Sequence, residues 1–127
     1  MKENDISGEV VDICIQIHTL LGPGLLESAY EKILYSELQQ RDLKVRRQVY
    51  LPVEWKGVEV SPGFRADLIV EDKVILEIKS LDALAQVHYK QVRTYLKLSG
   101  LKLGLLLNFG EILIKDGIHR IANNMTS

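Results

Sequence analysis

Hydrophobic residues recur at steps of three and four over the first forty residues, which is the spacing of one face of an α-helix. The pattern predicts two amphipathic helices, at residues 5–21 and 25–41, with Asn4 or Asp5 as the first cap. The glycine and proline residues at 22–24 separate them. The expected inward-facing residues are Val10, Ile13, Cys14, Ile17, Leu20 and Leu21 in the first helix, and Leu26, Ala29, Tyr30, Ile33, Leu34 and Leu38 in the second.

Beyond the second helix the period changes to two, which is the period of β-strands. Four strands are expected, at residues 44–52, 53–60, 65–70 and 74–79. A turn at Lys56-Gly57 interrupts the second of them. A third helix is expected at 81–98, entered through Ser80 or Asp82, and further strands at 101–108, 111–115 and 118–121. The order αα-ββββ-α-ββ(β) predicts one α/β (α+β) domain over residues 1–127, with a mixed sheet flanked by helices.

The segment 65–79 carries the clearest chemical pattern in the chain. If its turn centres on Asp72, Asp67 faces Glu77 directly across two antiparallel strands, with their Cβ atoms about 4.5–5.5 Å apart. Alternation predicts an apolar face that points into the core, made of Ala66, Leu68, Val70, Val74, Leu76 and Ile78. The opposite face carries Arg65, Asp67, Ile69, Ile75, Glu77 and Lys79.

Two carboxylates in directly opposed positions repel and destabilise a sheet. A divalent cation removes the repulsion, and paired oxygen ligands suit Mg²⁺ or Mn²⁺. Lys79 lies on the same face as Glu77, where it would meet a metal-bound water or a phosphate oxygen. The alternative is a surface salt bridge in which Lys79 simply neutralises the pair.

Composition sets the class of protein. At 127 residues, with 46% hydrophobic and 26% charged, the chain has the proportions of one ordered globular domain. The net charge of −1 argues against coating nucleic acid by charge alone. The charge is unevenly distributed along the chain. Residues 1–42 hold 8 acidic and 3 basic side chains, whereas residues 43–127 hold 9 acidic and 13 basic ones.

The cysteine, the histidines and the hydropathy of the chain argue against several kinds of site and location. Cys14 is the single cysteine, so no internal disulfide forms, and with three scattered histidines it gives no zinc-ligand spacing. The N-terminus lacks a signal-peptide pattern, and no apolar stretch is long enough to cross a bilayer. We therefore expect a cytoplasmic protein with no membrane partner.

Several blocks of the sequence together resemble a known family. Asp67, followed after nine residues by Glu77-Ile78-Lys79, resembles the signature of the PD-(D/E)XK nuclease superfamily. The spacing of Gly24, Glu27 and Tyr30 resembles the pattern that names its small GxxExxY branch. Further agreement comes from the blocks at 63–68, 91–95 and 107–110. The resemblance covers about residues 5–122.

The resemblance implies a restriction-endonuclease-like core and Mg²⁺-dependent (or Mn²⁺-dependent) phosphodiester hydrolysis. By this resemblance, Asp67, Glu77 and the main-chain carbonyl of Ile78 hold the metal, and Lys79 orients or helps to deprotonate the attacking water. Supporting catalytic residues of the recombination and repair type would be Glu27, Gln91 and Tyr95. The proline of the superfamily's name is absent, since Ala66 precedes Asp67, at a position that varies widely.

Further residues near these blocks are candidates for binding the substrate, namely Tyr30, Arg65, His88 and Arg93. His88, Gln91 and Tyr95 are spaced three and four apart and are expected to share a face of the third helix. Their alternatives are ordinary packing for Tyr30, Gln91 and Tyr95, and a solvated helix face for Arg93. His18 and His119 are expected to be structural.

The first function hypothesis is a metal-dependent nuclease with nucleic acid, expected to be DNA, as its partner. The alternative is a non-catalytic domain that binds nucleic acid or protein through the same cleft, since the chain is small, acidic and poor in aromatic residues. A third hypothesis is hydrolysis of a nucleotide or another phosphoester. A small nuclease often needs two sites or a larger footprint, so a homodimer is a further expectation, which no residue in the sequence marks.

Overall fold

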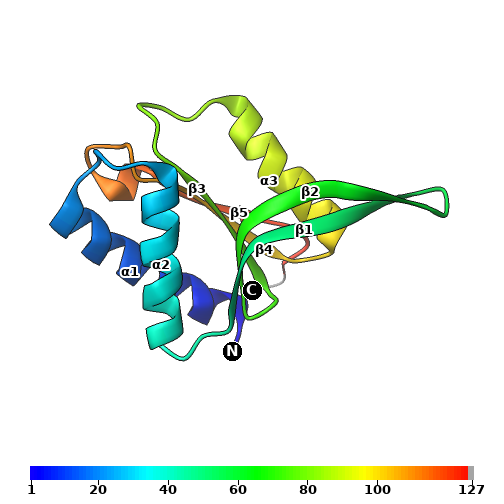
Figure 1. Cartoon of the computed structure of the whole chain (residues 1–127), viewed down its shortest axis with the longest axis horizontal. Helices are drawn as coiled ribbons and strands as arrows, with labels where there is room; N and C mark the ends of the chain where they lie inside the picture. The colour runs from blue at the N-terminus through cyan, green and yellow to red at the C-terminus, as the bar shows by residue number, and fades with distance from the viewer. Residues whose placement is uncertain (126–127) are drawn as a thin grey trace.

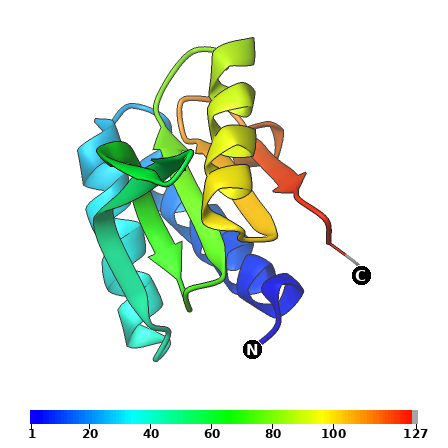
Figure 2. The same cartoon turned by 90° about the vertical axis from the view of Figure 1, so that its right-hand side faces the viewer.

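One mixed β-sheet, with helices on both faces, organises the chain (Figures 1 and 2). The computed structural model describes residues 1–125. The helices are α1 (Glu3–Leu21), α2 (Glu27–Gln40), α3 (Gln86–Ser99) and the short 3-10 helix η1 (Ile114–Asp116). The strands are β1 (Val45–Trp55), β2 (Val58–Val70), β3 (Val74–Lys79), β4 (Leu103–Asn108) and β5 (Ile118–Ala122).

The sheet has the order β1-β2-β3-β4-β5, with β3 at its centre. Neighbouring strands are antiparallel except for β3 and β4, which are parallel. Helix α3 makes the crossover between these two parallel strands, as parallel pairing requires. The expected α+β architecture, with a mixed sheet flanked by helices, is confirmed.

Each face of the sheet carries its own hydrophobic cluster. Helices α1 and α2 cover one face, where their buried residues pack on Leu68, Leu76 and Ile78. Helix α3 covers the other face through Val92 and Leu96. Because the central strands are buried on both sides, every residue of β4 and five of the six residues of β3 are buried.

The β1–β2 hairpin is much longer than the rest of the sheet. Its distal half, residues 50–65, is called the arm here, and it projects away from the helices (Figure 1). Residues 54–63 are all exposed. The arm begins close to Asp67, so it leads directly away from the opposed carboxylates.

Several predicted element boundaries were wrong. The strands expected at 44–52, 53–60 and 65–70 form only two strands, because β1 continues through Pro52 at an irregularity in the pairing and β2 runs through Gly63. The strand expected at 111–115 is replaced by a loop and η1. Helix α3 starts at Gln86 rather than near residue 81, with Ala85 as its cap in place of Ser80 or Asp82. Helix α1 begins at Glu3, with Lys2 as its cap.

Some residues expected to face the core do not. Leu20 is 83% exposed and Leu21 half exposed at the end of α1, and Leu26, which caps α2, is 76% exposed. Ala66 is buried, but it packs in the cluster beneath α3 rather than with Leu68. Strand β2 therefore switches faces at Asp67, between these two residues.

Candidate active site

The opposed carboxylates lie where the sequence pattern predicts. Strands β2 and β3 pair as Leu68 with Leu76, Ile69 with Ile75 and Val70 with Val74, so the hairpin centres on Asp72. Asp67 and Glu77 are the residues that follow the last pair on the two strands, and they lie close enough to interact. Asp67 Oδ2 accepts a hydrogen bond from the main-chain N–H of Ile78 at 2.9 Å, which fixes the carboxylate against β3.

Glu77 is an acid in an apolar and negatively charged environment. It is 6% exposed, and its Oε1 has no hydrogen-bond partner. Burial, and then the charge of Asp67, raise the pKa of Glu77 to about 9, and Lys79 partly offsets this. Such an orphaned buried oxygen beside a second carboxylate fits a hard cation, which would satisfy both groups.

The protein supplies few other ligands of the usual kinds. Among residues 1–125, no group of three or more histidine, cysteine, aspartate or glutamate side chains converges as a metal site. A cation here would therefore be held by Asp67 and Glu77 together with main-chain oxygen or water. Such partial protein coordination is usual for Mg²⁺, which retains several waters.

Lys79 ends β3 and pairs in the parallel ladder with Asn108 of β4. Asn108 is fully buried, and its side chain holds the loop that follows Lys79. Its Oδ1 accepts from the N–H groups of Leu81 and Gly110, at 2.9 and 3.1 Å, and its Nδ2 donates to Leu81 O at 3.0 Å. These hydrogen bonds of Asn108 therefore fix the end of the strand that carries Glu77 and Lys79.

Helix α2 brings Glu27 into a cavity that Asp67 also lines. A cavity of about 350 Å³ lies between α2 and the β1–β2 hairpin, lined by Glu27, Ser28, Glu31, Arg47, Gln48, Arg65, Asp67 and Ile78. Glu27 is exposed in the first turn of α2. The structure thus joins Glu27, Arg65 and Asp67 in one cavity, although they come from separate parts of the sequence.

Sequence reasoning missed Glu31, which follows Glu27 by one helical turn. Glu31 is 5% exposed, and its carboxylate accepts hydrogen bonds from Arg47 Nε and Nη2 at 3.2 and 3.1 Å and from Gln48 Nε2. A buried charge needs such partners. The four-residue spacing from Glu27 was the available signal, since it places both acids on one helix face.

Gln48 has an unusual backbone conformation inside β1. Its φ is 50°, in the left-handed region that residues other than glycine seldom adopt. The flanking pairs, Arg47 with Leu68 and Val49 with Ala66, place it opposite Asp67. The irregular backbone of β1 and the face switch of β2 therefore occur at the same point, beside the carboxylates.

Helix α3 places Tyr95 near the carboxylates but leaves Gln91 and Arg93 exposed. The Tyr95 ring stacks on Phe64, with 4.5 Å between centroids. Burial, and then the charges of Glu77 and Asp67, raise the pKa of Tyr95. Gln91 lies one turn earlier, outside the residues that line the cavity.

Two predicted substrate-binding residues make structural contacts. Tyr30 is fully buried and stacks on Phe109; its hydroxyl donates to Gly22 O and accepts from the Leu25 N–H at 3.1 Å. Tyr30 therefore holds the loop before α2 and leaves no surface for a substrate. His88 Nδ1 accepts from the Ala85 N–H at 2.9 Å, which caps α3.

Other sequence expectations fall outside the cleft. His18 is buried and its Nε2 lies 2.8 Å from Glu111 O, as expected of a structural residue. Burial raises the pKa of the Cys14 thiol to about 12. The part of the chain that the structure describes contains no helix of the length and apolarity needed to span a membrane.

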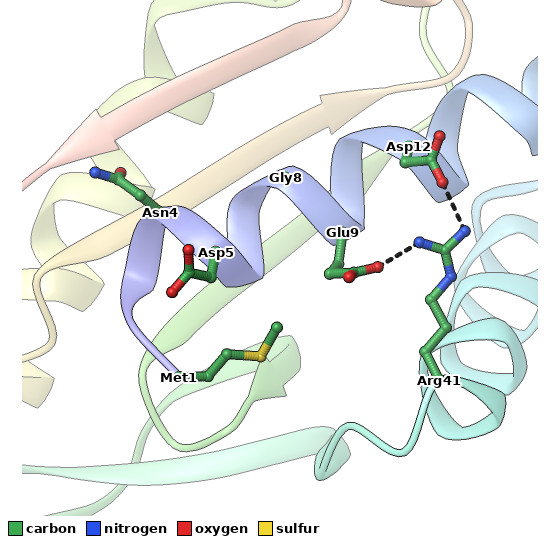
Figure 3. Close-up of a pocket in the computed structure, with 7 residues that line it drawn as sticks. All are labelled: Met1, Asn4, Asp5, Gly8, Glu9, Asp12 and Arg41. Carbon is green, nitrogen blue, oxygen red and sulfur yellow. Dashed lines mark hydrogen bonds and ion pairs between the residues drawn. The ribbon is translucent and has the colours of Figure 1, made fainter.

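A larger hollow shares no lining residue with the cavity at Asp67. It measures about 730 Å³ and lies along α1, lined by Met1, Asn4, Asp5, Gly8, Glu9, Asp12 and Arg41 (Figure 3). Arg41 pairs with Glu9 and, at 2.7 Å, with Asp12. These acids are therefore used to join α1 to the end of α2, and the hollow has no chemistry comparable to that at Asp67 and Glu77.

Comparison with known proteins agrees with this geometry. A family model described as the PD-(D/E)XK nuclease superfamily matches residues 4–121. The chain therefore belongs to this superfamily, whose members generally use divalent metal ions and act on nucleic acid.

Other comparisons add little. No curated protein matches the chain. A solved structure described as "Crystal structure of SSO0001" is similar, with 20% identity and a TM-score of 0.49. The alignment covers 79% of this chain and 52% of that one, so this chain spans about half of that protein's length.

Proposed function

We propose that this chain is a divalent-metal-dependent phosphodiesterase that cuts nucleic acid, with DNA as the expected substrate. The observation that carries the proposal is the opposed pair Asp67 and Glu77, with the buried and unpartnered Oε1 of Glu77. The environment of Glu77 disfavours its ionised form beside Asp67, and a bound divalent cation would let both carboxylates ionise.

In this proposal Asp67, Glu77 and the Ile78 carbonyl hold Mg²⁺ or Mn²⁺. When bound, the ion would lower the pKa of a coordinated water and offset negative charge on the phosphate. Lys79 orients the attacking water or accepts its proton, and its charge attracts the anionic phosphate. The cation and Lys79 together reverse the negative field of the two carboxylates.

The surrounding residues have supporting roles in the proposal. Glu27 lines the cavity that Asp67 also lines, and Tyr95 of α3 lies near Glu77 and Asp67. We assign Gln91, which is exposed one turn before Tyr95, a supporting role on the same helix. Arg65, an exposed residue lining the cavity, and Arg93 contact the substrate backbone. We also place the chain in the GxxExxY branch, where Tyr30 ties down the loop that positions Glu27.

The test is cleavage of a panel of single-stranded, duplex and branched DNA and of RNA, with Mg²⁺ or Mn²⁺. Wild type is compared with Glu77→Ala and Lys79→Ala, and with Lys115→Ala, an exposed lysine on η1, as the matched control. We expect at least a roughly hundredfold loss in the first two, about 2.7 kcal/mol of transition-state stabilisation, and no loss in the third.

Two outcomes would contradict the proposal. Activity that survives unchanged in both site variants would identify a contaminant. Inactivity of the wild type on every substrate, together with no metal binding by calorimetry, would leave a binding domain on a nuclease fold. A panel that also includes nucleotides separates nucleic acid from smaller phosphoesters.

A further inference from the structure

Gln48 interrupts the alternation of side chains along β1. Arg47 and Gln48 are successive residues, yet both donate hydrogen bonds to the carboxylate of Glu31 on α2. The next residue, Val49, packs beneath α3 on the other face of the sheet. Successive side chains of a regular strand point to opposite faces, so regular geometry would turn Gln48 toward α3. β1 instead carries two neighbouring side chains on its α2 face.

The left-handed backbone of Gln48 accompanies this change of face. Gln48 lies within a strand, whereas the other residues besides glycine with a positive φ in the range 1–125 lie in turns or bends, namely Asp42, Lys56, Glu71, Asp72 and Asn124. No inserted residue accounts for it, because the pairs Arg47 with Leu68 and Val49 with Ala66 leave one residue between them on each strand. Such a backbone costs stability and persists only where its surroundings hold it, which is typical of functional sites.

This backbone brings a polar side chain into the cavity. Gln48 and Asp67 lie opposite each other, and both line the cavity of about 350 Å³ together with Glu27. The buried carboxylate of Glu31 accepts a hydrogen bond from Gln48 Nε2. Because an ionised carboxylate can only accept, Nε2 must face Glu31, and the acceptor Oε1 lies on the other side of the amide.

An additional acceptor beside Asp67 suits the water shell of a cation. Few side chains in the described part of the chain can serve as direct ligands there, so a cation held by Asp67 and Glu77 would retain several waters. Groups that hydrogen-bond to what the metal holds contribute to its affinity without touching the metal. An amide does this without adding negative charge beside the two carboxylates.

We infer that Gln48 is a positioning residue for the candidate metal site. Its side-chain oxygen accepts a hydrogen bond from water bound to a cation at Asp67, and Glu31 holds the amide in place. The inference rests on the proposed function, because that proposal places the cation at Asp67 and Glu77. It extends the site from the β2–β3 hairpin to β1 and α2.

Calorimetric titration with Mn²⁺, in the absence of nucleic acid, tests the inference independently of cleavage. Gln48→Gly is the main variant, because it removes the amide and glycine adopts a left-handed φ without strain. We expect it to bind Mn²⁺ roughly tenfold more weakly than wild type. Gln40→Ala, which changes an exposed glutamine at the end of α2, is the matched control and is expected to bind Mn²⁺ like wild type.

A second variant, Gln48→Asn, tests whether the amide itself is responsible. Asparagine is enriched in the left-handed region and retains a carbonyl acceptor. We expect its Mn²⁺ affinity to lie between that of Gln48→Gly and that of wild type. A purely structural role would not give this order, because glycine is the residue best suited to the backbone at this position. Circular dichroism and urea unfolding in EDTA verify that each variant is folded before titration.

Wild-type Mn²⁺ affinity in Gln48→Gly would overturn the inference, and so would weaker binding of an oligonucleotide with unchanged Mn²⁺ affinity, since Gln48 would then contact the substrate. Failure of both variants to fold would make Gln48 a structural residue and would also overturn it. Failure of the proposed function is instead seen in the wild type. Mn²⁺ binding that depends on Gln48, without cleavage of any substrate, would sustain the inference and contradict the enzyme.

Discussion

At the scale of single residues, Glu77 is an acidic side chain whose environment disfavours its charged form. Its carboxyl group is buried, faces Asp67 and has one oxygen without a partner. The ionised form is disfavoured by burial and by the neighbouring charge, so the folded protein without metal retains a proton there at neutral pH. The unfolded chain releases that proton near the ordinary pKa of glutamate.

This difference predicts that Glu77→Gln stabilises the metal-free protein increasingly as the pH rises. Between the unfolded pKa of about 4.5 and the folded pKa of about 9, the folded state binds the extra proton, so wild-type stability falls with rising pH. Glutamine does not titrate, so the stability of the variant does not fall with rising pH through this side chain. From pH 5.5 to 8.5 we expect the variant to gain about 2–4 kcal/mol on wild type, at up to 1.36 kcal/mol per pH unit.

Urea unfolding in EDTA at the two pH values measures this difference. Asp67→Asn is the companion variant, because it removes the neighbouring charge and leaves the burial of Glu77, and its pH dependence should be shallower than that of wild type. Parallel pH dependence in wild type and Glu77→Gln would contradict the protonation assigned to Glu77.

The sequence predicted residues well where strand alternation alone decides their place. Asp67 faces Glu77 because the turn at Asp72 sets the register, and that register is a local property of the hairpin. Glu31 was missed because its partners Arg47 and Gln48 lie on a different element. The helical period predicted that Tyr30 faces the core, but not its stacking on Phe109, which is distant in the sequence.

At the scale of elements, two glycines show how differently helix and sheet tolerate a side chain. Gly8 lies inside α1, where an added Cβ meets nothing within 4 Å. Gly104 lies in β4 beneath α3, where a Cβ would lie 2.6 Å from Val92 Cγ1. The first glycine therefore lowers helix stability without a packing reason, whereas the second is needed for α3 to approach the sheet.

We predict opposite effects of the same substitution at these positions. Gly8→Ala is expected to raise the free energy of unfolding by about 0.5–1 kcal/mol, through helix propensity. Gly104→Ala is expected to lower it by about 1–3 kcal/mol, through overpacking. Chemical denaturation of the two variants checks the signs; destabilisation by Gly8→Ala would contradict the open space assigned to this position.

Element boundaries were predictable only where the signal is local. The strand at 74–79 and the end of α3 at Gly100 follow from alternation and from a left-handed cap residue. The continuity of β1 through Pro52 does not, because an irregularity in its pairing with β2 accommodates the proline. The late start of α3 likewise depends on the loop held by Asn108, which no periodicity reveals.

At the scale of the whole molecule, the uneven charge along the sequence corresponds to the layers of the fold. Residues 1–42, with 8 acidic and 3 basic side chains, form the α1–α2 layer, and the more basic remainder forms the sheet and α3. Part of the acidity is used internally, since Glu9 and Asp12 pair with Arg41, and Glu31 with Arg47. The outer surface of α1 is therefore less favourable to a polyanion than the more basic remainder of the molecule.

The arm and the central strand also differ in how they open. Residues 54–63 are exposed throughout, whereas β3 is hydrogen-bonded on both sides and covered by helices on both faces. Local opening should therefore release the arm amides to hydrogen exchange within seconds, while amides of β3 exchange only when the whole domain unfolds. Exchange measured by mass spectrometry over 53–63 and 74–79 tests this, and equal protection would contradict it.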